Sequence, residues 1–473
     1  MFEIPFTGDL AHPVRFEAVA AWGTPRSVDR RPVAHNGGVR ETWRMAGTAP
    51  QDAIPDVLVV GAGIAGLTTA IVAARAGLRV VCIDPDPPPR ERVGESLDWA
   101  APPLLERLQM PVHSLVQAGT GTWKREVHGV STSGRHLVGR PARWMGRWPL
   151  RFQFETVHVD RARFDTALHE AASSAGVRFV RDRVAGVDVD QDRVVRCWTQ
   201  SGKPLTARWF IDGSGRARLF ARAFGIGRIE FGPTRVAIWA QCEAPQRLDG
   251  TMLYLDDGPA DLRWAWEIPL TPHRQSVGVV ISNAEFQERR HSRTASATIL
   301  RDILAGFPGI TRCRSKELHA ARVRSVRCYT HRRVTGGNWL MVGEAAAFVD
   351  PLTSTGVSAA MRHGIEAAEI IGSGRQQRAK RALGRFDRRV RSLSNLYNNA
   401  IEALLYSPGV RRNVGIRWAA RAYVILGFGI CALYARIGGI GAARHAGVLG
   451  IAGGYRLWMH GWLLLGGGRE TGP

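Results

Sequence analysis

The stretch that decides the fold is Val57-Leu-Val-Val-Gly-Ala-Gly-Ile-Ala-Gly66, in which an apolar run meets three glycines at fixed spacing. Four consecutive apolar residues before a glycine turn predict a short buried strand. Gly61 suits a tight turn, Gly63 permits a pyrophosphate to approach the backbone, and Gly66 permits a helix to pack closely on the strand. The spacing therefore predicts a nucleotide-binding turn between a strand and a helix.

The residues after this turn complete the unit. Residues 64–76 have helical periodicity, and residues 78–83 form a second apolar run that ends at Asp84. A phosphate is stabilised at the N-terminus of such a helix because free N–H groups and the helix dipole favour anions. Asp84 is placed to accept hydrogen bonds from ribose hydroxyls. Strand, turn, helix, strand and acid, in this order, predict an adenine dinucleotide site.

Further elements extend this unit to an α/β fold of several parts. We predict a helix at 161–175, strands between 177 and 211, a sheet rich in Trp, Val and Ile between 235 and 282, a buried strand at 338–343, and helices at 355–372 and 375–405. The predicted organisation is a poorly ordered extension over residues 1–54, a discontinuous nucleotide-binding domain over 55–230 and 320–375, a substrate-facing antiparallel β-sheet domain over 231–319, and a helical C-terminal region over 376–473. Met45 lies about ten residues before the first strand, and we hypothesise that the natural chain starts there.

The formal net charge of +23 is carried almost entirely by arginine, since the only lysines are Lys124, Lys203, Lys316 and Lys380. The arginines are dispersed along the chain and do not alternate with aromatic residues in one stripe, so we expect no nucleic-acid binding. An acidic partner, such as a carrier protein, or an anionic substrate is compatible with this charge.

The cysteines and the apolar segments indicate the compartment. The six cysteines include no Cys-x-x-Cys pair and no zinc spacing with histidine, so we expect no metal site and reduced thiols in a cytoplasm. Residues 1–20 lack the pattern of a signal peptide. The apolar stretch 422–435 has 14 residues, fewer than the ~20 that span a bilayer. Residues 417–462 combine apolar residues with spaced arginines, which is compatible with contact to a membrane surface.

Segments downstream of the turn resemble the flavin-contacting motifs of monooxygenases with the glutathione-reductase-type fold. These segments are Asp212-Gly213, the helix start at Arg161 with Phe164-Asp165, and residues 343–356, which we call the flavin loop. The resemblance implies that the dinucleotide is FAD, bound in a Rossmann domain with an inserted sheet. The family places an aspartate against the ribityl chain where this sequence has Glu344, which is one methylene longer.

Two motifs resemble those of flavin-dependent halogenases, and of tryptophan halogenases in particular. One is Trp264-Ala-Trp-Glu-Ile-Pro269, and the other joins Phe348, Pro351, Ser354 and Gly356 in the flavin loop. The alternative for the first motif is that a Trp-rich strand only packs a sheet against a helix. The resemblance extends over about residues 55–400.

Two further matches lie between the glycine turn and the sheet. Pro89-Arg-Glu-Arg-Val-Gly-Glu-Ser96 resembles the halogenase segment beside the flavin. Lys124 lies close to where tryptophan halogenases carry a catalytic lysine, and a chain with four lysines has little chance of placing one there at random. Sister monooxygenases have an aromatic-Gly strand in this region, so Lys124 is also compatible with an ordinary strand residue.

The resemblance implies that reduced FAD, supplied by a separate flavin reductase, and oxygen convert halide to hypohalous acid. Backbone amides of Thr355 and Gly356, at a helix start, are expected to hold the halide. Lys124 is expected to bind the oxidant and deliver it to an arene, since an ammonium offers several donors on a long stem. Trp264 and Trp266, with Ser354, are expected to separate flavin from substrate. The residues expected to contact FAD are Gly61, Gly63, Gly66, Asp84, Arg92, Glu95, Arg161, Asp212, Gly213, Gly343, Glu344, Asp350, Pro351, Thr355 and Gly356.

Other functions share the nucleotide motifs. Tryptophan halogenases carry a glutamate before the Ser-Thr-Gly of the flavin loop, and here that position is Thr353. This departure, which halogenases of phenols and pyrroles share, leaves an indole, a phenol or a pyrrole as the substrate, free or tethered to a carrier or peptide. It also favours an aromatic hydroxylase, for which Lys124 is not needed. The apolar C-terminus adds two alternatives, a reductase of the geranylgeranyl reductase type and a non-catalytic flavin-binding protein at a membrane.

Overall fold

A five-stranded parallel sheet forms around the glycine turn. In the computed structural model, β1 (Val57–Val60) lies in its middle, and the strand order is β17 (Trp339–Met341), β11 (Trp209–Asp212), β1, β2 (Val80–Ile83) and β7 (Arg178–Val180). The pairs β1–β11, β1–β2, β11–β17 and β2–β7 are all parallel. Both faces of β1 are buried, which explains its uninterrupted apolar sequence. The predicted strands at 57–60, 78–83 and 338–343 are confirmed to within a few residues.

The structure describes residues 54–86, 88, 91–134, 136–139, 155–243, 250–256, 261–292, 294–310, 320–373 and 376–407. The predicted N-terminal extension, apart from Ile54, and the apolar stretch 417–462 lie outside these residues. Within the described part of the chain, no helix is both long and apolar enough to cross a membrane.

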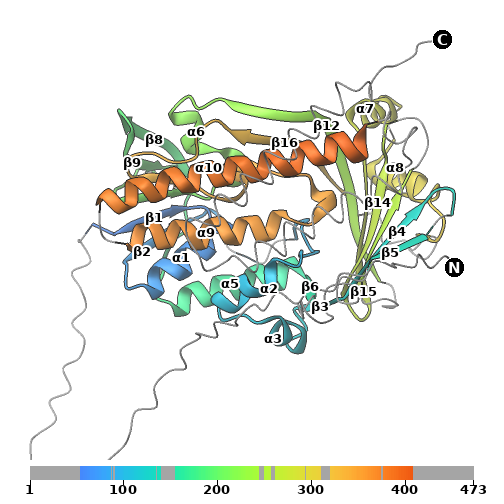
Figure 1. The fold of residues 1–473 in the computed structure, drawn as a ribbon, viewed down its shortest axis with the longest axis horizontal. Helices are drawn as coiled ribbons and strands as arrows, with labels where there is room; N and C mark the ends of the chain where they lie inside the picture. Colours follow the sequence, from blue (N-terminus) through green and yellow to red (C-terminus); the bar gives the residue numbers. More distant parts are fainter. Residues whose placement is uncertain are drawn as a thin grey trace, which may run out of the picture. The chain divides into compact units, whose positions relative to one another are not determined.

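Helices cover this sheet (Figure 1), and the four described next begin within one residue of their predicted starts. Helix α1 (Ile64–Arg75) follows the turn directly and is buried along most of its length. Helix α5 (Arg161–Ser174) is capped by Asp160, whose side chain accepts hydrogen bonds from the backbone N–H groups of Ala162 and Arg163. Helix α9 (Gly356–Gly372) runs beside the long helix α10 (Gln376–Ile401), which continues into a π-helical turn, η6 (Glu402–Tyr406).

The second large element is an eight-stranded sheet. Its order is β18 (Ala347–Phe348), β16 (Arg322–His331), β12 (Arg228–Glu243), β15 (Arg274–Ser282), β14 (Trp264–Thr271), β13 (Gly250–Leu255), β4 (Glu126–Ser131) and β5 (His136–Gly139). The sheet was predicted to be antiparallel, and it is so except that β13 pairs with β4 in parallel. Four strands of this sheet, β4, β5, β16 and β18, come from outside residues 231–319, because segments distant in the sequence form its two edges.

The two faces of this sheet have different neighbours. One face packs on α8 (Ser296–Leu304) through a cluster that includes Ile238, Val279 and Ile299. The other face carries Trp239, Trp264 and Trp266 and meets the end of α10. In Figure 1, α7 (Asn283–His291) and α8 lie at the end of the molecule away from β1. The Trp-bearing face therefore looks toward the nucleotide-binding part.

The remaining elements are short. They are α2 (Ala101–Arg107), α3 (Val112–Gln117), β3 (Gly121–Lys124), β6 (Thr156–Val159), β8 (Val184–Asp190), β9 (Arg193–Thr199), β10 (Pro204–Leu205), η1 (Gly215–Ala217), α6 (Leu219–Ala223), η4 (Gly343–Ala345) and η5 (Pro351–Thr353). Strands β3 and β6 pair with each other beside the large sheet and hold Lys124.

Candidate active site

A cavity of about 760 Å³ lies between the glycine turn and the Trp-bearing face of the eight-stranded sheet. Most of the residues predicted for the site line it: Gly61, Gly63, Asp84, Arg92, Glu95, Arg161, Gly213, Trp264, Trp266, Gly343, Glu344, Pro351, Ser354, Thr355 and Gly356. Four predicted residues, Gly66, Asp212, Asp350 and Lys124, are not part of this lining. The fold thus brings segments from five separate regions of the sequence to one cavity.

Two of the three glycines in the turn are required because a Cβ would clash at their positions. Gly61 has a φ of +100°, and a Cβ on it would lie 2.5 Å from the carbonyl oxygen of Gly213. A Cβ on Gly66 would lie 2.0 Å from the carbonyl oxygen of Gly61. At Gly63 the nearest atom to such a Cβ is a guanidinium nitrogen of Arg92, 3.9 Å away, so this position is open toward the cavity. The first and third glycines serve packing, and the second leaves the room that a pyrophosphate needs.

The three aspartates of the predicted site accept hydrogen bonds from the backbone, and two of them, Asp212 and Asp350, are buried. Asp84 accepts a hydrogen bond from the N–H of Ala62 at 2.7 Å and also lines the cavity. Asp212 accepts from the N–H groups of Ser214 and Phe220 at 2.9 and 2.8 Å, which shapes the turn after β11. Asp350 accepts from the N–H of Leu352 and caps η5. The structure therefore places Asp212 and Asp350 behind the cavity, where they hold the loops that line it.

The flavin loop ends at the N-terminus of α9. Ser354 has a φ of +59°, in the left-handed region, and lines the cavity just before the helix. Thr353 and Thr355 share a hydrogen bond between their hydroxyl oxygens at 2.8 Å. Thr355 and Gly356 open a helix of 17 residues whose first turn has no acidic side chain. The free N–H groups of this turn and the helix dipole favour an anion at this point of the cavity.

Glu95 supplies a buried carboxyl group to the cavity wall. Gly94 donates a hydrogen bond from its N–H to Oε2 at 3.0 Å, whereas Oε1 is buried and makes no hydrogen bond to any described residue. Burial raises the pKa of Glu95, while the charge of Arg161 and the neighbouring hydroxyl group of Ser276 oppose this rise. Arg161 itself is held by Asp165 at 2.9 and 3.0 Å. A buried oxygen without a partner in a cavity wall is a group that a bound ligand satisfies.

Lys124 is a buried cation beside the cavity, with 2% of its surface exposed. Its ammonium group donates hydrogen bonds to the Ser96 hydroxyl and the Leu97 carbonyl, each at 2.8 Å. Its Nζ also lies 4.8 Å from the centre of the Trp99 ring. Ser96 lines the cavity, whereas Lys124 does not. In this conformation the ammonium group therefore acts on the cavity through Ser96.

Ser96 connects Lys124 to further polar groups that the sequence did not indicate. Its hydroxyl oxygen lies 3.1 Å from that of Thr251, which in turn lies 2.8 Å from Nε2 of His158. Burial, followed by the charge of Lys124, lowers the pKa of His158 well below its usual value, so this imidazole is neutral. The contacts join residues from β3, β6 and β13. Only Ser96 belongs to a segment that a motif could have identified.

Trp264 and Trp266 form one wall of the cavity. Both side chains are buried on the same face of β14, and their rings lie 5.5 Å apart with an angle of 44°. The indole N–H of Trp266 donates to the Ser276 hydroxyl at 3.2 Å, and that of Trp264 donates to the Tyr406 hydroxyl at 2.9 Å. Both polar edges are thus occupied, and the apolar parts of the rings are available to face the cavity. Tyr406 was not predicted, because it lies 142 residues from its partner.

These features fit a flavin dinucleotide. The open position at Gly63, the α1 N-terminus and the unpartnered oxygen of Glu95 offer contacts to a large polar ligand. A model for FAD dependent oxidoreductases matches residues 56–230, which contain the turn and Glu95. The fold and the site therefore define an FAD-dependent oxidoreductase with the predicted Rossmann-type fold and additional sheet.

The particular family follows from a second match. The model of the tryptophan halogenase family matches residues 150–403, which is more than half of the chain. The chain therefore belongs to the tryptophan halogenase family. This confirms the predicted relationship and FAD as the cofactor.

Characterised relatives support this placement. The tryptophan 2-halogenase of Chondromyces crocatus is 29% identical over 332 residues, which are 67% of this chain and 61% of that protein. A 1H-pyrrole-2-carbonyl-[peptidyl-carrier protein] brominase of Pseudoalteromonas luteoviolacea is 27% identical over 330 residues, 67% of this chain and 77% of that protein. The chain thus spans less than two thirds of the length of the first of these relatives. A triple mutant of the flavin-dependent brominase Bmp2 has the same fold, with a TM-score of 0.66 and 22% identity over 85% of this chain and 99% of that structure.

Proposed function

We propose that this protein uses reduced FAD, oxygen and halide to place chlorine or bromine on an electron-rich aromatic substrate. The observation that supports this most is the position of Trp264 and Trp266, which form a wall of the cavity opposite the glycine turn. When bound, reduced FAD together with oxygen would oxidise halide to hypohalous acid. A wall between the cofactor and the substrate favours halogenation over direct oxygen transfer.

The residues of the cavity have distinct roles in this proposal. The first turn of α9, at Thr355 and Gly356, holds the halide by its free N–H groups. Lys124 polarises the Ser96 hydroxyl, which faces the cavity and orients the halogenating species. The neutral imidazole of His158 and the hydroxyl of Thr251 extend this chain of hydrogen bonds and hold the Ser96 hydroxyl in place.

The substrate is proposed to be an indole, a phenol or a pyrrole. The relatives bear names that refer to tryptophan and to a pyrrole group on a peptidyl carrier protein. Thr353 occupies the position before Ser354 where tryptophan halogenases carry a glutamate, and halogenases of phenols and pyrroles share this departure. The net charge of +23 supports a substrate tethered to an acidic carrier protein. A separate flavin reductase supplies the reduced cofactor.

The test compares wild type with Lys124→Met, which keeps the length of the side chain and removes its charge. Both proteins receive photochemically reduced FAD, oxygen and bromide with a panel of indoles, phenols and pyrroles, and products are identified by mass spectrometry. We expect brominated product from wild type and about 100-fold less from Lys124→Met. Lys203→Met, at an exposed position, is the matched control.

Two outcomes contradict the proposal in different ways. An oxygenated product that forms equally without added halide identifies a hydroxylase, which is the alternative function. Equal bromination by wild type and Lys124→Met leaves the halogenase intact and removes the role assigned to Lys124.

A further inference from the structure

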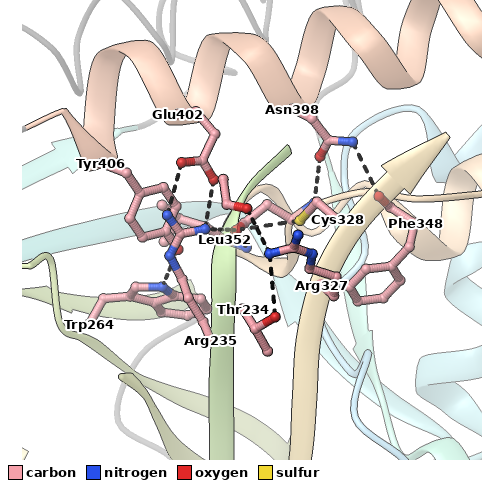
Figure 2. A network of polar contacts seen from close by, with 12 residues as sticks. Thr234, Arg235, Trp264, Arg327, Cys328, Phe348, Leu352, Asn398, Glu402 and Tyr406 are labelled. Carbon is pink, nitrogen blue, oxygen red and sulfur yellow. Dashed lines mark hydrogen bonds and ion pairs between the residues drawn. The ribbon is translucent and has the colours of Figure 1, made fainter. Parts of the chain in front are cut away.

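The π-helical turn η6 at the end of α10 contacts strand β12 through Glu402 and the tryptophan wall through Tyr406 (Figure 2). Glu402, in this turn, accepts two hydrogen bonds from the guanidinium of Arg235, at 2.6 and 2.9 Å. The same guanidinium lies over the Tyr406 ring, 3.3 Å from its centre. Arg235 comes from β12 and is buried, whereas the side chain of Glu402 is 23% exposed. A π-helical turn is less favourable than a regular helix and is often found at functional sites.

Tyr406 contacts a tryptophan of the wall and the arginine that faces a carboxylate of the flavin loop. Its hydroxyl oxygen accepts the hydrogen bond of the Trp264 indole at 2.9 Å. The guanidinium of Arg235, which lies over the Tyr406 ring, is 4.0 Å from Oδ2 of Asp350. All of these side chains are buried. Burial raises the pKa of Asp350 to about 6, and the hydrogen bond from the Leu352 N–H and the charge of Arg235 oppose this rise.

The flavin loop is bound to the same helix at a second point. Asn398, on α10, accepts a hydrogen bond from the N–H of Asp350 and donates one to the carbonyl of Phe348, both at 3.2 Å. Figure 2 shows Asn398 above Phe348 and Tyr406 beside Trp264, along one side of the helix. The end of α10 therefore contacts the wall and the loop together, although neither Tyr406 nor Asn398 lines the cavity.

We propose that Tyr406 is a positioning residue that fixes Trp264 relative to the flavin loop. The hydroxyl accepts from Trp264, and Arg235, which lies over the Tyr406 ring, faces Asp350 of the loop, so Tyr406 links the indole to the loop. Arg235 and Glu402 hold the Tyr406 ring and keep the hydroxyl in place. The consequence for the product rests on the proposed function, whereas the position of Trp264 does not.

The variant Tyr406→Phe removes the hydroxyl and keeps the ring on which Arg235 lies. The indole N–H of Trp264 then loses its hydrogen-bond partner inside the protein. A buried polar group without a partner is unfavourable enough to drive a side chain to a new position. We expect Trp264 to reorient and the wall to open. The ratio of released hydrogen peroxide to halogenated product is then expected to rise about tenfold, because this factor corresponds to the free energy of about one buried hydrogen bond.

The matched control is Tyr254→Phe. Tyr254 is also buried in the same sheet, and its hydroxyl donates to Glu267 at 2.5 Å, but it packs on the α8 face away from the cavity. This change removes a buried tyrosine hydroxyl at comparable depth. It is expected to leave Trp264 and the product ratio unchanged.

Two readouts separate this inference from the proposed function. Fluorine NMR of cofactor-free, fluorotryptophan-labelled protein reports the environment of Trp264, whose resonance is assigned with Trp264→Phe. We expect this resonance to shift in Tyr406→Phe and to stay in place in Tyr254→Phe. The ratio of peroxide to halogenated product is then measured on the FAD-loaded proteins. If wild type does not halogenate, the proposed function fails and the NMR result still decides the inference.

A second variant guards against loss of folding in Tyr406→Phe. Glu402→Gln weakens the hold on Arg235 and keeps the tyrosine hydroxyl, so it is expected to shift the Trp264 resonance in the same direction but less. The inference is overturned if the resonance stays unchanged in both variants, or if Tyr254→Phe shifts it as far as Tyr406→Phe does.

Discussion

The wall of the cavity depends on Gly278, which lies on β15 opposite Trp239 on one neighbouring strand and Trp266 on the other. A Cβ on Gly278 would lie 2.3 Å from Cζ2 and 2.4 Å from Cη2 of Trp266, and 2.7 Å from Cβ of Trp239. Ordinary carbon contacts are about 3.5 Å, so Gly278→Ala must move the Trp266 ring by about 1 Å. Overpacking of this kind costs about 1–3 kcal/mol of folding free energy.

The same displacement predicts a loss of activity. A shift of about 1 Å in a positioned site can reduce the rate by about 100-fold. We therefore expect Gly278→Ala to make halogenated product roughly 10- to 100-fold more slowly, while its dissociation constant for FAD stays close to that of wild type. The assay is product formation from reduced FAD, oxygen and bromide, followed by mass spectrometry, with FAD affinity measured by fluorescence titration.

Gly186→Ala is a matched control for this variant. Gly186 also lies in a strand beside a tryptophan, but its Cβ would be 3.8 Å from Trp198, at ordinary contact distance. It is expected to leave both the rate and the melting temperature unchanged. A Gly278→Ala protein with wild-type rate and stability would refute the role assigned to the position of Trp266.

Three further predictions concern the cofactor site and the flavin loop. Gly66→Ala places a Cβ 2.0 Å from the Gly61 carbonyl, so FAD binding is expected to be lost in a fluorescence titration. Asp84→Asn removes the charge that accepts the hydrogen bond of the Ala62 N–H, and we expect about tenfold weaker FAD binding in the same titration. Burial raises the pKa of Asp350 from its ordinary value of 3.8 to about 6, so the folded state holds this proton more tightly than the unfolded state. The resulting stabilisation is complete below pH about 3.8 and is lost as the pH rises through about 6. The melting temperature of Asp350→Asn is therefore expected to fall less than that of wild type between pH about 4 and about 7.

Local patterns were sufficient to predict the nucleotide-binding part. The three glycines, the strand at 57–60 and Asp84 lie within one short segment. A tight turn beside a helix constrains the residue type at each of these positions. The resemblance carried by the tryptophan motif implied a wall, and alternate residues of a strand share a face. The structure places both rings on one face of β14.

Contacts between distant segments were not predictable. Arg235 and Glu402 are 167 residues apart, and the solvation cost of burying Arg235 is offset by Glu402, Asp350 and the Tyr406 ring, which come from distant parts of the sequence. No sequence motif includes His158, yet its contact with Thr251 of β13 makes it part of the network behind Ser96. The parallel pairing of β13 with β4 was missed for the same reason, because strand alternation does not indicate which distant strand is the neighbour.

The most direct test of the central claim is a single-turnover reaction of the wild-type protein with reduced FAD, oxygen and an electron-rich arene, run with and without bromide. We predict a brominated arene, identified by its bromine isotope pattern, only when bromide is present. A hydroxylated arene formed at the same rate in both reactions would contradict the account.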